Sequence, residues 1–115
     1  MRIIDCFMYF DEDLVLEIRL NTLNKIVNKF VICEATRDHA GNKKKLKFDI
    51  NKFSEFREKI NYLVVDDIPV KVKPLKKNWH ENHTRDQFQR NALEREIKNF
   101  NPEDLIMISD IDEIP

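Results

Sequence analysis

Two carboxylates, Asp110 and Asp112, directly follow the apolar run Leu105 to Ile108 near the C-terminal end of the sequence. Residues two apart in an extended chain point to the same side, so both acids can face one site while Ile111 points away and can be buried. Mg²⁺ and Mn²⁺ prefer oxygen ligands and often use only one or two protein carboxylates, with phosphates and water completing the shell. The pair therefore predicts a divalent-metal site for a phosphorylated ligand, although the same spacing is common in solvated turns and helix caps.

Glu34 occupies a similar position, because it ends the apolar run Phe30 to Cys33. In open α/β sheets, ligands collect beyond the carboxyl ends of the strands, so this acid is a second candidate. Thr36 and Arg37 follow it and either line the same pocket or are ordinary loop residues. Since Gly41 is the only glycine, no glycine-rich phosphate loop exists, and a metal held by carboxylates is the plausible substitute.

Arg90 and Gln89 lie in a third candidate region, a helical pattern over residues 85–99. A guanidinium suits bidentate recognition of phosphate or carboxylate, but Arg90 could equally pair on the surface with Glu94, one helical turn away. Gln89 falls within the apolar arc of the helix, which requires either hydrogen-bond partners or a cavity beside its amide.

The remaining reactive side chains are interpreted as structural. His80 and His83 lack the two further ligands that a zinc site needs, so a solvated loop is favoured. Trp79 is more typical of a core anchor than of a stacking platform for a sugar or base. Cys6 and Cys33 each lie in an apolar run, which favours buried thiols over a disulfide.

Composition places the chain among soluble globular proteins. Its 115 residues include 20 Lys and Arg against 21 Asp and Glu, a net charge of -1, which argues against nucleic-acid binding. The apolar runs are far shorter than the roughly 20 residues that span a bilayer, so no membrane span is expected. Acidic residues interrupt the first twenty positions where a signal peptide would be apolar, so we expect a single cytoplasmic domain, 1–115.

The elements that would position these residues alternate along the chain. Short β-rich runs occupy residues 3–10, 30–33, 62–65 and 105–108, while apolar stripes at helical spacing follow the first three of them. The first stripe contains Leu16, Leu20, Leu23 and Val27, and a weaker one contains Phe53, Phe56 and Ile60. Residues 35–47 and 70–84 have no period and are predicted as loops. This alternation predicts an α/β fold with a mostly parallel sheet and flanking helices.

Five segments together resemble glycosyltransferase family 17, the family of the β-1,4-mannosyl-glycoprotein 4-β-N-acetylglucosaminyltransferases. They match in order through nearly the whole chain, and the last is the most specific. The segments are Asp5 to Phe10, Leu16 to Leu20, Val31 to Thr36, Gln89 to Asn91, and Ile108 to Pro115.

The resemblance implies a GT-A-type, Rossmann-like fold that binds a UDP-sugar, UDP-N-acetylglucosamine in the best-known members. It implies Mn²⁺ or Mg²⁺ at Asp110 and Asp112 and transfer with inversion to an N-glycan or other hydroxyl acceptor. The donor contacts that we expect are Glu34, Thr36, Arg90, Asn91 and Asp110. Gln89 stands where many GT-A enzymes have the first residue of an Ala-Arg-Asn segment, which is a departure from that pattern.

No general base for such a transfer is identifiable in the sequence, and we expect it beyond Pro115. The chain therefore resembles the N-terminal portion of a transferase and an incomplete domain. Its partners would be a C-terminal continuation or other copies of itself, which would associate through an open sheet edge. The alternative is a non-catalytic α/β module that binds a nucleotide sugar or a partner and is inactive because it is truncated.

Overall fold

The computed structural model describes residues 1–70 and 81–115, so Trp79 and His80 lie outside the described residues. The elements follow the predicted alternation of strands and helices. In chain order they are β1 (Ile3–Met8), α1 (Asp13–Leu23), β2 (Lys29–Ala35), the 3₁₀ segment η1 (Ile50–Lys59), β3 (Ile60–Val65), α2 (Glu81–Ala92), α3 (Glu94–Ile97) and β4 (Leu105–Ser109).

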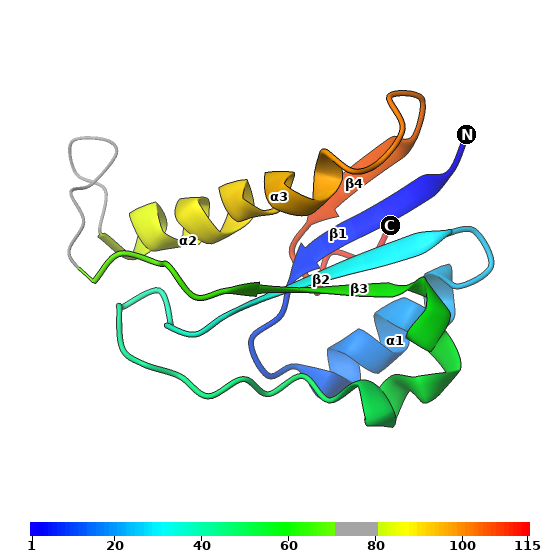
Figure 1. Ribbon diagram of the computed structural model, residues 1–115. Coiled ribbons are helices and arrows are strands. Elements are labelled where there is room, and N and C mark those ends of the chain that lie inside the picture. The colour runs from blue at the N-terminus through cyan, green and yellow to red at the C-terminus, as the bar shows by residue number, and fades with distance from the viewer. Residues whose placement is uncertain (71–80) are drawn as a thin grey trace.

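The strands form one parallel sheet in the order β3-β2-β1-β4 (Figure 1). From β1 the chain moves outward to β2 and β3, and then returns to pair β4 with the other side of β1. In the register, Cys6 lies opposite Val31 of β2 and Ile108 of β4. The predicted α/β class and the parallel sheet are confirmed. The order also reverses at β1, and the crevice at such a reversal is where open α/β sheets bind ligands.

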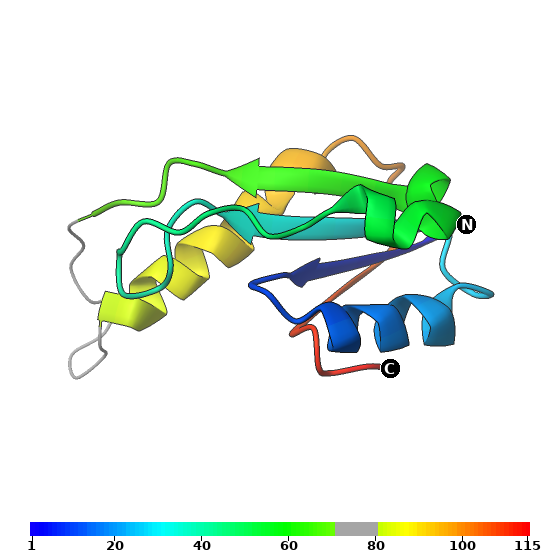
Figure 2. The ribbon, with the colours of Figure 1, turned by 90° about the horizontal axis from the view of Figure 1, so that it is seen from below.

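Helices cover both faces of the sheet, which explains why β1 and β2 are nearly continuous apolar runs. Alternate strand residues, among them Phe7 and Ile32, face α1 and η1, where Leu16, Leu20 and Phe53 complete one core. Helices α2 and α3 lie on the other side of the sheet from α1 (Figure 2). The intervening strand residues form a second core on that side. Its buried members are Ile4, Cys6, Val31, Cys33, Ala35, Val65, Ile68, Ala92 and Leu93.

Two helical segments differ from the sequence-based prediction. Of the predicted stripe, Phe53 and Phe56 lie in the 3₁₀ segment η1, which has a kink at Phe53, whereas Ile60 is the first residue of β3. The two phenylalanines are three residues apart, which matches the three-residue turn of a 3₁₀ helix. The loop predicted over residues 70–84 extends too far along the sequence, because α2 begins at Glu81. His83 therefore lies on a helix and not in a loop. In the described residues no helix has both the length and the apolar character needed to cross a bilayer.

Candidate functional site

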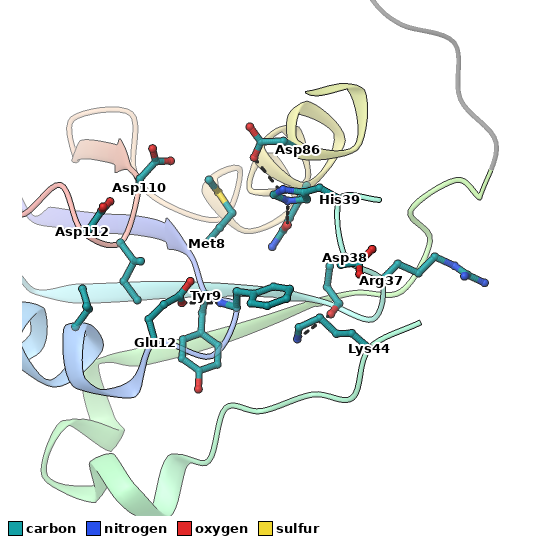
Figure 3. A pocket seen from close by; sticks show the side chains of 15 residues that line it. Met8, Tyr9, Glu12, Arg37, Asp38, His39, Lys44, Asp86, Asp110 and Asp112 are labelled. Atoms are coloured by element: carbon teal, nitrogen blue, oxygen red, sulfur yellow. Dashed lines mark hydrogen bonds and ion pairs between the residues drawn. The ribbon is translucent and has the colours of Figure 1, made fainter. Parts of the chain in front are cut away.

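A cavity of about 340 Å³ opens beyond the carboxyl ends of the strands, beside the reversal in strand order (Figure 3). Segments that follow β1, β2 and β4 line it, together with one face of α2. The carboxylates of Asp110 and Asp112 lie at one end of the view, and Arg37 and Lys44 lie at the other. The full lining is Met8, Tyr9, Phe10, Glu12, Val15, Ala35, Arg37, Asp38, His39, Lys44, Asp86, Gln89, Asp110, Ile111 and Asp112.

The predicted acid pair is present in this cavity, but its backbone is a turn rather than an extended strand. β4 ends at Ser109, and the amide of Glu113 donates to the carbonyl of Asp110 at 3.0 Å. The Glu113 carboxylate in turn accepts from the Asp110 amide at 3.0 Å. Ile111 is buried in the α1-side core, as predicted, while the acids on either side of it are exposed. We call residues Ser109–Glu113 the acidic turn.

Arg90 joins helix α2 to this turn. Its Nη2 lies 2.6 Å from Oδ1 of Asp110 and 4.0 Å from Oδ1 of Asp86, whereas the predicted surface alternative was Glu94. The Asp110 side chain is 54% exposed, so the pair is open to solvent and can rearrange. Arg90 does not itself line the cavity.

Asp112 is the acid that is available to a ligand. In residues 1–70 and 81–115 its carboxylate makes no hydrogen bond or ion pair, and no group of three or more potential metal ligands exists there. Two exposed carboxylates on one turn fit a cation of the Mg²⁺ or Mn²⁺ type that takes its other ligands from phosphate and water. They do not fit a structural zinc site, which would require four protein ligands.

A buried ion pair lies directly beneath the acidic turn, and sequence reasoning missed it. Arg19 of α1 and Asp5 of β1 are both fully buried, and their side chains meet through two hydrogen bonds of 2.8 and 2.6 Å. The guanidinium continues to the turn, where it donates to three main-chain carbonyls and to Ser109 Oγ. The signal was present in the sequence, because each charge interrupts an apolar pattern.

Glu34 lies outside the cavity, although it does end β2 as predicted. Its carboxylate is fully buried and binds four donors from the chain itself. Oε2 accepts from Lys44 Nζ at 2.5 Å and from the Lys47 amide at 2.7 Å, while Oε1 accepts from the Phe48 amide at 3.1 Å and from the Tyr62 hydroxyl at 2.6 Å. These bonds attach the loop 36–48 to the sheet, so the geometry gives Glu34 a structural role. Contact with a donor stays a prediction.

Thr36 and Asn91 are likewise outside the cavity. The backbone of Thr36 bonds to Val65 and Lys44, and the Asn91 side chain accepts from Gln87 at 2.8 Å on the exposed side of α2. The structure thus brings together Asp110, Asp112 and Arg90 of the predicted residues, and leaves Glu34, Thr36 and Asn91 apart. None of these positions tests whether the residue touches a donor.

Gln89 has both of the features expected for an amide on an apolar helix face. It is 4% exposed, its Nε2 donates to the carbonyl of Cys33 at 3.2 Å, and its Oε1 lies 3.0 Å from Nε2 of His39 at the cavity wall. Because the amide nitrogen faces a carbonyl, Oε1 must accept, and His39 Nε2 must carry the proton. On the same loop as His39, Lys44 has a structural role, since it pairs with Glu34.

The end of β1 is fixed by a short hydrogen bond from Tyr9 to Asp13. The hydroxyl lies 2.5 Å from the carboxylate, and this bond lowers the pKa of Asp13, an effect that Lys52 at 3.1 Å reinforces. Burial, followed by the same hydrogen bond, raises the pKa of the Tyr9 hydroxyl. Phe10, the next residue, is 52% exposed and presents its ring at the cavity mouth beneath the Lys44 ammonium, 5.2 Å away.

The charges around the cavity determine what it can hold. Five carboxylates line it, of which Asp110 is paired with Arg90. Its basic side chains are Arg37, His39 and Lys44, and Lys44 is already paired with Glu34. A diphosphate brought alone into this surplus of negative charge would be repelled. A divalent cation at the acidic turn would reverse that balance, so the chemistry of the site favours metal and phosphate together.

The parallel sheet with helices on both faces defines an α/β, Rossmann-like class of fold, and folds of this class bind ligands beyond a reversal in strand order. The family model "Glycosyltransferase family 17" matches residues 1–115, and the chain belongs to this family. It is 28% identical over 119 residues to the human and rat β-1,4-mannosyl-glycoprotein 4-β-N-acetylglucosaminyltransferases, and 27% identical to the mouse enzyme. Each match covers 99% of this chain but only 22% of the relative. No solved structure matches significantly.

Proposed function

We propose that the chain forms the donor-binding part of a glycosyltransferase and binds a UDP-sugar, UDP-N-acetylglucosamine in the first instance, together with Mn²⁺ or Mg²⁺. The observation that carries the proposal is the pair Asp110 and Asp112 on a turn that lines the cavity at the reversal of strand order. Membership of family 17 and the names of its relatives support the transferase class and the sugar. A GT-A type of fold is part of the same proposal.

The chain's own residues divide the work of binding. Asp112, which has no partner among the described residues, would hold the cation, and Asp110 would share it or contact the ribose. A bound metal would act as a Lewis acid that neutralises the charge developing on the departing diphosphate. Arg90 lies at 2.6 Å from Asp110, where it can hold that carboxylate or turn toward a phosphate oxygen. Transfer with inversion to a glycan hydroxyl requires a base that we do not assign within these residues.

Calorimetric titration of the chain with UDP and UDP-N-acetylglucosamine, with and without Mn²⁺, tests the proposal. We expect binding that requires the metal, and we expect Asp112→Asn to abolish the metal requirement together with most of the affinity. Asp66→Asn is the matched control, because Asp66 is an exposed acid that follows β3 at the same end of the sheet but lies outside the cavity. Binding that is indifferent to metal, or that Asp66→Asn weakens as much as Asp112→Asn, would refute the proposed site.

A further inference from the structure

The side chain of Arg19 attaches the acidic turn to the interior of the protein. All five N–H groups of the Arg19 guanidinium have acceptors: Nε and Nη2 bind the two oxygens of Asp5, and Nη2 also reaches Ser109 Oγ at 2.7 Å. Nη1 donates to the main-chain carbonyls of residues 110, 111 and 113 at 2.9, 3.2 and 3.1 Å. The guanidinium of Arg19 thus binds both Asp5 of β1 and the backbone of the acidic turn.

The turn has few other constraints. Its internal hydrogen bonds run from the Glu113 amide to the Asp110 carbonyl, from the Asp110 amide to the Glu113 carboxylate, and from the Ser109 hydroxyl to the Glu113 carbonyl at 3.3 Å. All of them involve the exposed residue Glu113, so water can replace them. Only the side chain of Ile111 also reaches the core. Ser109 is paired with Phe7 of β1 at the end of the sheet, and Arg90 holds the exposed carboxylate of Asp110 from α2. Beyond Ser109, Arg19 is therefore the one buried side chain among the described residues that binds the backbone of the turn to β1.

We propose that the buried pair Asp5–Arg19 positions the carboxylates of Asp110 and Asp112 for binding a divalent cation with a nucleoside diphosphate. Arg19 touches neither ligand, so it acts through the acidic turn. Groups that orient metal ligands from behind typically change metal affinity by about 10- to 100-fold when they are altered. The inference rests on the proposed function, because it names the residues that make that site a rigid one.

Arg19→Lys is the decisive variant, since it keeps the charge but replaces a planar five-donor fork by a three-donor ammonium. An ammonium that binds Asp5 cannot also reach three carbonyls and a hydroxyl. We expect the affinity for Mn²⁺ in the presence of UDP, measured by calorimetry, to fall by about 10- to 100-fold. A second variant, Arg19→Met with Asp5→Leu, replaces the buried ion pair by apolar side chains, which preserves the stability of the fold. It should show the same loss of affinity for Mn²⁺ in the presence of UDP.

Arg2→Lys is the matched control. Arg2 pairs with Asp104 at 2.9 Å and joins β1 to β4 as the Arg19 network does, but at the amino ends of these strands. This variant should bind Mn²⁺ and UDP like the unaltered chain. All variants are compared at a temperature at which circular dichroism shows each to be folded, so that a loss of affinity reports on the site.

Hydrogen exchange provides a readout that does not depend on any ligand. Arg19→Lys should make the Glu113 amide exchange faster than it does in the unaltered chain. The exchange rate of the Tyr9 amide, which donates to the Cys33 carbonyl at 2.8 Å, should not change. Equal Mn²⁺ affinity in Arg19→Lys and in the unaltered chain would overturn the inference. If the unaltered chain binds neither metal nor UDP, the proposed function fails instead, and the exchange of Glu113 alone decides whether Arg19 positions the turn.

Discussion

Glu34 is the residue whose predicted and observed settings differ most, and Glu34→Gln distinguishes them. Each carboxylate oxygen accepts two hydrogen bonds, so whichever oxygen becomes an NH₂ group will face two donors. Two charge-assisted bonds at about 1.5–3 kcal/mol each are lost. Lys44, whose side chain is 10% exposed, also loses its counter-ion. The expected cost is about 3–5 kcal/mol, the range found when one partner of a buried ion pair is removed.

Thermal unfolding followed by circular dichroism measures this cost. For a domain of this size we expect the Tm to fall by at least about 12 °C, at roughly 4 °C or more for each kcal/mol. Glu55→Gln makes the same chemical change at an exposed position of η1 and should alter the unfolding free energy by no more than about 0.5 kcal/mol. If Glu34→Gln keeps the Tm and instead loses affinity for UDP, the anchoring role is wrong and the carboxylate contacts the donor.

Three further predictions concern the thiols, the loop and acid stability. Burial raises the pKa of Cys6 to about 12 and of Cys33 to about 11. Ellman's reagent at pH 8 should therefore label neither thiol until guanidinium chloride unfolds the chain. Rapid labelling of the folded chain would contradict this prediction. Gly41→Ala should lower the free energy of unfolding, measured in urea, by about 1–3 kcal/mol. The φ angle of Gly41 is +93°, and an added Cβ would lie 2.8 Å from the guanidinium of Arg85. An unchanged urea midpoint would refute the predicted strain. The pKa of Asp13 is lowered, so its contribution to stability is complete above the ordinary carboxyl pKa of 3.8 and is lost as the pH falls below that value. Asp13→Asn should therefore reduce the dependence of the unfolding free energy on pH in this acid range. An unchanged pH dependence would contradict the role of Asp13.

The sequence predicted the parts of the structure that depend on local patterning. Apolar runs identified all strands of the described sheet. Ile111 is buried between two exposed acids as predicted, although the backbone there is a turn and not the extended chain on which the prediction was based. Gln89 was also identified correctly as an amide that needs partners. Each of these inferences uses neighbours in the chain, and none requires knowing which distant segments meet.

The parts that sequence reasoning did not find depend on contacts between distant residues. Nothing near Glu34 in the sequence shows that Lys44 and Tyr62 return to it, so its role in anchoring the loop was not predicted, while its contact with a donor stays a prediction. Arg19 does interrupt an apolar pattern, but its acceptors in the acidic turn lie about ninety residues later in the chain, so the sequence does not show what it binds there. The extended geometry expected for Asp110 and Asp112 failed for the same reason, because the carbonyl-binding guanidinium favours a turn.

The pairing of β4 with β1 also has a consequence for how the chain assembles. Until β4 is present, β1 is an edge strand, and Asp5 stands at its centre next to a free row of backbone donors and acceptors. An inward-pointing charge on an unpaired edge discourages association with other chains. The same carboxylate that supports the acidic turn would therefore protect β1 before β4 pairs with it, and the bonds from Arg19 to the acidic turn would form only when this last strand is in place.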